Sequence, residues 1–166
     1  MKKVKYTAKI LCAVLALVMC FSQFAFAAET NDTYYTGFTV KTTSWESVSM
    51  TGDGDTLKSG RNKTDKTPIY IYNTSATNSS VKAKVLGYRS TNRVADSLGE
   101  NCTYRYTFVY VPRKQTSSIR STVYEKGYRV ADIELCSVSG TDVISGCWSP
   151  DSTKTYTVVT NVKPAD

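Results

Sequence analysis

The side chains that most often carry out acid–base and nucleophilic chemistry are scarce in this sequence of 166 residues. It contains no histidine, which excludes a Ser-His-Asp triad, a Cys-His dyad and histidine-based metal sites. The carboxylates form two close pairs, Asp53 with Asp55 and Asp132 with Glu134. Residues two apart on a strand share a face, so either pair could converge on a glycosidic bond. We interpret the first pair as a loop tip and the second as the solvent face of a strand, and therefore expect no enzymatic activity.

Asp53 and Asp55 also supply the oxygen ligands that calcium prefers. The spacing of a calcium-binding loop is not followed, because Leu57 and Arg61 stand where that loop needs ligands. An ordinary polar turn is therefore the favoured interpretation of this weak calcium candidate. We expect neither a metal ion nor a cofactor.

Tyrosine is abundant, with 12 residues in the chain. Flat aromatic rings beside hydrogen-bonding side chains suit the recognition of sugars or peptides. Packing of one tyrosine face in the core is the alternative. The candidate ligand-binding residues are Tyr70, Tyr72, Tyr104, Tyr106 and Tyr110.

A basic segment follows this aromatic region. Arg113, Lys114 and Arg120 surround two serines and form a predicted loop that could touch an anionic polymer or lipid. Simple solvation of the three charges is the more common use of such a loop.

The first 27 residues predict an export signal. A lysine-rich start precedes the mostly apolar run 10–21, and small residues at Ala25 and Ala27 fit a cleavage site. An uncleaved anchor and a lipoprotein at Cys20 are the less favoured alternatives. Cleavage would lower the formal net charge from +7 to +3, which is too weak to indicate nucleic-acid binding. We expect a secreted protein, with association at the cell surface as a variant of that location.

Three of the five cysteines lie outside the predicted signal: Cys102, Cys136 and Cys147. If Thr141-Asp142 is the tip of a hairpin, Cys136 stands opposite Cys147 at a separation that a disulfide can span. The alternatives are that both thiols are reduced in the core, or that Cys102 takes one of them.

Apolar and polar residues alternate in several short segments, a pattern typical of half-buried strands. Turn-forming residues separate these segments, and no long helix is predicted after the signal. We expect a flexible lead-in at 28–33 and one all-β domain at 34–166, an antiparallel β-sandwich or barrel. The clearest predicted strands are 69–72, 81–85, 103–111 and 158–162.

Three stretches, 58–65, 125–128 and 143–152, resemble a loose group of small exported proteins from Gram-positive bacteria. The resemblance covers most of the chain through short motifs. It implies export and an uncharacterised role, and no functional residue carries over from it.

These observations favour a secreted, non-enzymatic binding protein that acts at or near the bacterial cell envelope. The expected partner is a cell-wall polymer, a glycan or an envelope protein; we expect no nucleic acid and no stable membrane span after signal removal. An exported toxin or bacteriocin-like effector is the first alternative. An envelope hydrolase that uses paired carboxylates is the second.

Overall fold

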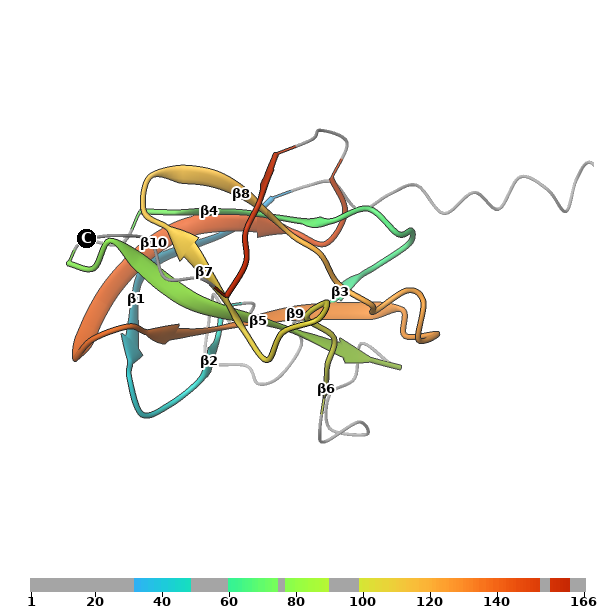
Figure 1. Cartoon of the computed structure of the whole chain (residues 1–166), viewed down its shortest axis with the longest axis horizontal. Helices are drawn as coiled ribbons and strands as arrows, with labels where there is room; N and C mark the ends of the chain where they lie inside the picture. Colours follow the sequence, from blue (N-terminus) through green and yellow to red (C-terminus); the bar gives the residue numbers. More distant parts are fainter. Residues whose placement is uncertain (1–31, 49–59, 75–76, 90–98, 153–155, 162–166) are drawn as a thin grey trace, which may run out of the picture.

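The computed structural model describes residues 32–48, 60–74, 77–89, 99–152 and 156–161. Within these ranges the regular secondary structure consists of β-strands alone. The strands form two sheets that pack face to face (Figure 1). This confirms the all-β, sandwich-like class expected from the alternation. The predicted export signal and the pair Asp53 and Asp55 lie outside the described residues.

The first sheet has the strand order β1-β10-β4-β8-β11. All its pairs are antiparallel except β11 with β8, which is parallel. Its strands are β1 (Thr33–Lys41), β4 (Ile69–Asn73), β8 (Gln115–Ile119), β10 (Thr141–Ser149) and β11 (Thr157–Val158).

The second sheet has the order β2-β9-β5-β6, with β3 also paired to β9 and β7 also paired to β5. All of these pairs are antiparallel. Its strands are β2 (Glu46–Ser47), β3 (Arg61–Asn62), β5 (Ser80–Tyr88), β6 (Glu100–Asn101), β7 (Val109–Pro112) and β9 (Val130–Ser137).

The core lies between the sheets and is built by the period-two pattern of the strands. In β4 the isoleucines Ile69 and Ile71 are fully buried while Tyr70 and Tyr72 are half-exposed on the other face, as the sequence pattern predicts. β10 contributes Ile144 and the largest buried side chain, Trp148. Facing residues from the second sheet complete the core; they include Val81, Ala83, Val85, Ile133 and Leu135.

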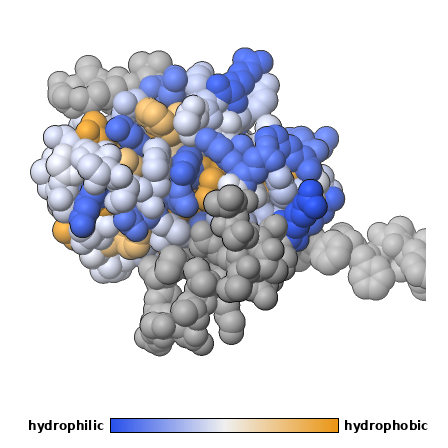
Figure 2. Space-filling view, turned by 90° about the horizontal axis from the view of Figure 1, so that it is seen from below, coloured by the Kyte–Doolittle hydropathy of each residue, from blue (hydrophilic) through white to orange (hydrophobic). Residues whose placement is uncertain are grey.

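The outer face of the second sheet is covered by long polar side chains. Lys84 Nζ lies 4.7 Å from the centre of the Trp45 ring, and Lys82 Nζ lies 5.6 Å from that of Phe108. From below, hydrophobic residues appear as small areas separated by hydrophilic ones (Figure 2). This distribution is typical of a sheet face that is in contact with water.

The predicted strand 103–111 is wrong over its first half. The backbone N–H of Tyr106 donates to the carbonyl oxygen of Thr103 at 3.4 Å, which makes a turn of these four residues. Arg105 has a φ of 65° there, in the left-handed region, so the backbone cannot continue as a strand. Regular pairing begins only at Val109 in β7.

The predicted hairpin that would join Cys136 to Cys147 is also wrong. Residues 138–140 carry the chain from β9 in the second sheet to β10 in the first, so these two strands do not pair. Both edges of β9 are taken by β2, β3 and β5, and both edges of β10 by β1 and β4. Cys102, Cys136 and Cys147 are all buried and free.

The C-terminal segment 156–161 closes one open side of the sandwich. Figure 1 shows it crossing from β8 in the first sheet toward β7 in the second. Val159 donates its N–H to Ser118 at 2.9 Å, and Thr160 accepts the N–H of Tyr110 at 2.8 Å. The side chain of Val159, in this segment, is buried with the core residues, so the segment closes the gap between the sheets.

Candidate functional site

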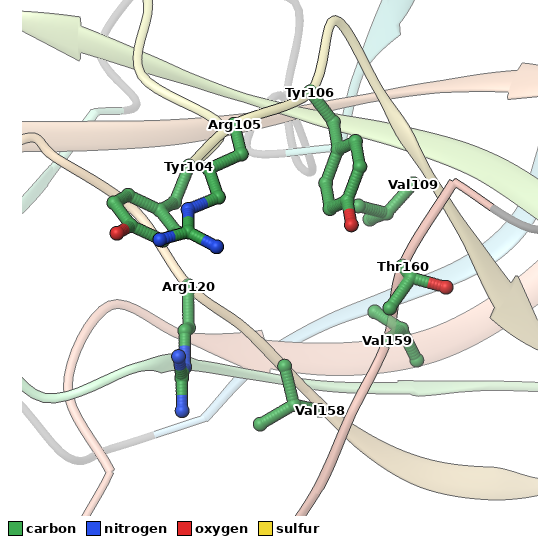
Figure 3. Close-up of a pocket in the computed structure, with 8 residues that line it drawn as sticks. All are labelled: Tyr104, Arg105, Tyr106, Val109, Arg120, Val158, Val159 and Thr160. Atoms are coloured by element: carbon green, nitrogen blue, oxygen red, sulfur yellow. The ribbon is translucent and has the colours of Figure 1, made fainter.

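A pocket opens where the C-terminal segment meets the turn at 103–106. It has a volume of about 120 Å³. Figure 3 shows the guanidinium of Arg105 and the hydroxyl of Tyr106 directed toward the space between the turn and the C-terminal segment. The lining residues are Tyr104, Arg105, Tyr106, Val109, Arg120, Val158, Val159 and Thr160.

Backbone contacts hold the two arginine-bearing walls together. The N–H of Tyr104 donates to the carbonyl oxygen of Arg120 at 3.0 Å, which ties the turn to the end of β8. The neighbouring bridge between Thr103 and Ser121 continues that pairing. Arg105 and Arg120 are therefore carried by adjacent backbone segments of the pocket wall.

The turn itself holds Arg105 in an unfavourable conformation. Arg105 is the third residue of the four-residue turn and has a φ of 65°. Glycine or asparagine usually occupies a turn position with a positive φ. The guanidinium carbon lies 5.0 Å from the centre of the Tyr104 ring, within the range of a cation–π contact. A charged, exposed side chain at a strained position is a pattern found at functional sites.

The charge of the lining is entirely positive. It combines two arginines with tyrosine, threonine and valine, and no carboxylate is among the lining residues in the described part of the chain. A guanidinium offers a planar set of donors that matches the oxygens of a carboxylate or a phosphate. The arrangement can therefore bind an anionic group, and the tyrosine rings can contact a flat part of the same ligand, such as the face of a sugar ring.

The structure divides the five candidate tyrosines among three places. Tyr104 and Tyr106 lie in the pocket with Arg120. Tyr70 and Tyr72 lie on the outer face of the first sheet, where the Tyr70 ring centre is 5.0 Å from that of Tyr156.

Tyr110 lies on β7 of the second sheet, and its ring centre is 5.5 Å from that of Phe108. Its backbone reaches the pocket wall at Thr160, but its side chain is absent from the residues that line the pocket.

The predicted basic loop is likewise divided. Arg113 and Lys114 lie in the exposed turn between β7 and β8, and Lys114 also has a positive φ, of 57°. Arg120 follows the other end of β8 and lines the pocket. Of the three residues of the predicted basic loop, only Arg120 therefore lies with Tyr104 and Tyr106.

The carboxylates Asp132 and Glu134 do not form an open pair. Asp132, expected on a solvent face, is fully buried, because β2 covers it and Ser47 donates its hydroxyl to both carboxylate oxygens, at 2.8 and 3.0 Å. Glu134 forms an ion pair with Lys84 at 2.7 Å. Among the described residues, no group of three or more Cys, Asp or Glu side chains could hold a metal ion.

The cysteines are unsuited to nucleophilic attack in the folded state. Burial raises the pKa of Cys102, Cys136 and Cys147, and the thiolate is the reactive form. The Cys136 thiol donates to the carbonyl oxygen of Lys41 at 3.3 Å, and Cys147 Sγ lies 3.6 Å from the Tyr70 hydroxyl.

Sequence reasoning missed a buried ion pair outside the pocket. Lys63 Nζ lies 2.5 Å from Asp151 Oδ1, and the two side chains are 1% and 0% exposed. Asp65 lies beside them. The two sequence partners are 88 residues apart, so local periodicity carries no signal of this contact.

The chain belongs to a family described as a protein of unknown function (DUF2712), whose model matches residues 23–152. No curated protein and no solved structure matches it. The matched range includes the turn at 103–106 and the pair Lys63–Asp151, and it ends before the pocket wall at 158–160. In the part of the chain that the structure describes, no helix is long and apolar enough to cross a membrane.

Proposed function

We propose that the protein is an exported, non-enzymatic binding protein that recognises an anionic group of a cell-envelope polymer through the pocket at Arg105 and Arg120. The observation that carries the proposal is a lining with two arginines and no carboxylate, built on a turn that holds Arg105 at a positive φ. The lysine-rich start and small-residue cleavage site in residues 1–27 support export.

The size of the pocket limits what it can recognise. Sites for drug-sized ligands usually enclose about 300–1,000 Å³, whereas this pocket has about 120 Å³. A single phosphate or carboxylate with part of an adjoining sugar or polyol fits that volume. The remainder of a polymer would extend from the open mouth.

Titration with small anions tests the pocket directly. The probes are glycerol 1-phosphate and glucuronate, with uncharged glycerol and glucose as references, and the readout is the change in backbone amide NMR shifts. We expect saturable binding of at least one anion that weakens as salt rises, because the contacts are charge-assisted. Retention on isolated Gram-positive cell walls tests the envelope part of the proposal.

Two double variants separate the pocket from net charge. Arg105→Ala with Arg120→Ala should reduce anion affinity at least tenfold. Arg113→Ala with Lys114→Ala removes the same charge from the turn at the other end of β8 and should leave affinity within about twofold of wild type. Equal losses in both variants, or no binding of either anion, would refute the proposed site.

A further inference from the structure

Lys63 and Asp151 bring an amine and a carboxyl group into contact away from water. Lys63 follows β3 in the second sheet, where its N–H donates to Arg129 O at 2.8 Å; Asp151 follows β10 in the first sheet. The Lys63 Nζ also donates to the carbonyl oxygen of Thr67 at 2.6 Å. Lysine is rarely buried so completely, and here its amine lies closest to one oxygen of the Asp151 carboxyl group.

The second oxygen of that carboxyl group is held by two donors. The backbone N–H of Thr64 donates to Asp151 Oδ2 at 3.1 Å, and the Thr64 hydroxyl donates to the same atom at 2.8 Å. Negative charge that develops on Oδ2 during attack at the carboxyl carbon would be stabilised by these fixed dipoles. Oδ1, on the Lys63 side, is then the oxygen that can leave.

Asp65 supplies a third group with access to both partners. Its Oδ1 lies 3.4 Å from Lys63 Nζ, and the same amine lies 2.5 Å from Asp151 Oδ1, so Lys63 bridges the two carboxyl groups. Burial raises the pKa of Asp65, but hydrogen bonds from the hydroxyl and N–H of Thr67 outweigh this and lower it. Asp65 is therefore a charged proton acceptor beside the amine, and its side chain is 41% exposed, which opens a path for water.

The geometry points to an intramolecular amide bond between Lys63 Nζ and Asp151 Cγ that forms spontaneously once the domain has folded. A proton passes from the ammonium to the Asp151 carboxylate, and the neutral amine attacks Cγ. Asp65 accepts a second proton from the nitrogen and returns it to the departing Oδ1. One N–C bond forms, one C–O bond breaks and one water leaves; no oxidant or reductant takes part.

The bond would join the two sheets covalently. Its ends are 88 residues apart in the chain, so it would restrict the unfolded state as a long-loop disulfide does. Such a link would suit an exported protein whose cysteines are free, and none of its residues lines the anion pocket. The inference is independent of the proposed binding function.

Mass spectrometry of the full-length wild-type protein tests the inference. The first residue of the purified chain is established by peptide mapping. The intact mass should then be lower than the calculated mass by one water, about 18 Da. After unfolding and trypsin digestion, residues 62–66 should be recovered joined to residues 130–154, with no cleavage after Lys63. An intact mass equal to the calculated one would overturn the inference.

A cyclic imide at Asp151 would cause the same loss of mass, and the peptide map distinguishes it. Cleavage after Lys63 in a protein that lacks one water would overturn the amide bond. Lys63→Met should have its full calculated mass, whereas Lys66→Met, at an exposed neighbouring lysine, should retain the link. The linked wild type should melt about 10 °C or more above the folded Lys63→Met variant.

Asp65→Asn tests the role of Asp65 as proton acceptor. A folded Asp65→Asn protein, verified by its circular dichroism, should accumulate with its full mass and gain the link at least tenfold more slowly than wild type. Linkage at the wild-type rate would remove Asp65 from the reaction.

Discussion

The backbone N–H of Tyr110 donates to the carbonyl oxygen of Thr160 at 2.8 Å and so ties the C-terminal segment to the second sheet. The same segment pairs with β8 of the first sheet through β11. It thus bridges the layers, buries Val159 between them and supplies one wall of the pocket. Closure of the sandwich and formation of the candidate site depend on the same few residues.

Removal of the C-terminal segment should damage both stability and binding. A chain that ends at Ser152 loses the burial of Val159 and the hydrogen bonds to Ser118 and Tyr110. We expect a loss of about 2 kcal/mol in the free energy of unfolding, measured with urea, and loss of anion binding. A chain that ends at Asn161 is the control and should match wild type. Unchanged binding in the shorter chain would contradict the position of the wall.

Glycine at position 105 should stabilise the fold while it weakens binding. Arg105 has a φ of 65°, so Arg105→Gly relieves backbone strain worth about 1 kcal/mol but removes a guanidinium from the pocket. Lys114→Gly is the matched control because Lys114 has a φ of 57° in a turn outside the pocket. Both variants should unfold at higher urea, and only Arg105→Gly should bind anions more weakly. Equal binding by the two would argue against a ligand role for Arg105.

A methyl group at Gly146 should disrupt the first sheet. A Cβ there would lie 2.0 Å from the carbonyl oxygen of Tyr72 and 2.5 Å from the hydroxyl oxygen of Tyr35. Because the first contact is with backbone, Gly146→Ala should cost about 3 kcal/mol in chemical denaturation. Val143→Ala, at a half-exposed position of the same strand, should cost less than about 1 kcal/mol. Similar values for the two would show that β10 does not approach β4 as described.

Stability should fall in alkaline solution, in part because of Tyr35. Burial raises the pKa of this hydroxyl, which donates to the carbonyl oxygen of Tyr72 at 3.1 Å. Above about pH 10 the unfolded chain loses the Tyr35 proton and the folded chain keeps it, so the free energy of unfolding decreases as pH rises. Tyr35→Phe should cost about 1 kcal/mol at pH 7 and decline less steeply between pH 9 and pH 11. An identical alkaline slope would contradict the burial of this hydroxyl.

The three cysteines should be reduced and unreactive in the folded protein. Burial raises the pKa of each thiol, which lowers the fraction of thiolate available for alkylation. Iodoacetamide at pH 7.5 should label none of them in native protein and all of them in urea, without a reducing agent. A Cys136–Cys147 disulfide would leave both residues unlabelled in urea until reductant is added.

The alternation of apolar and polar residues predicted strands correctly where one face of the strand is buried and the other is not, as in residues 69–72 and 81–85. It misled at Tyr104–Tyr106, because the alternation of residue types persists through a turn and residue type does not reveal the positive φ of Arg105. The alternation of residue types also does not determine which strands pair with each other. Cys136 and Cys147 are on consecutive strands, yet other strands occupy every edge through which those two strands could have paired.

The candidate site was predictable only in fragments. Tyr104, Tyr106 and Arg120 were recognised as candidate residues, but residues 158–160, which complete the pocket wall, are distant in sequence. Lys63 reads as an ordinary surface lysine. Its burial depends on Asp151, a partner that only the packing of the two sheets brings within reach.

Mapping the anion on the folded protein tests the central claim most directly. In a titration of wild-type protein with glycerol 1-phosphate and glucuronate, the largest amide shift changes should fall at residues 104–106, 120 and 158–160. The account predicts that these changes saturate together and disappear when Arg105 and Arg120 are both replaced by alanine. Changes centred on Arg113 and Lys114 or on the tyrosine face of β4, or no saturable change with either anion, would contradict it.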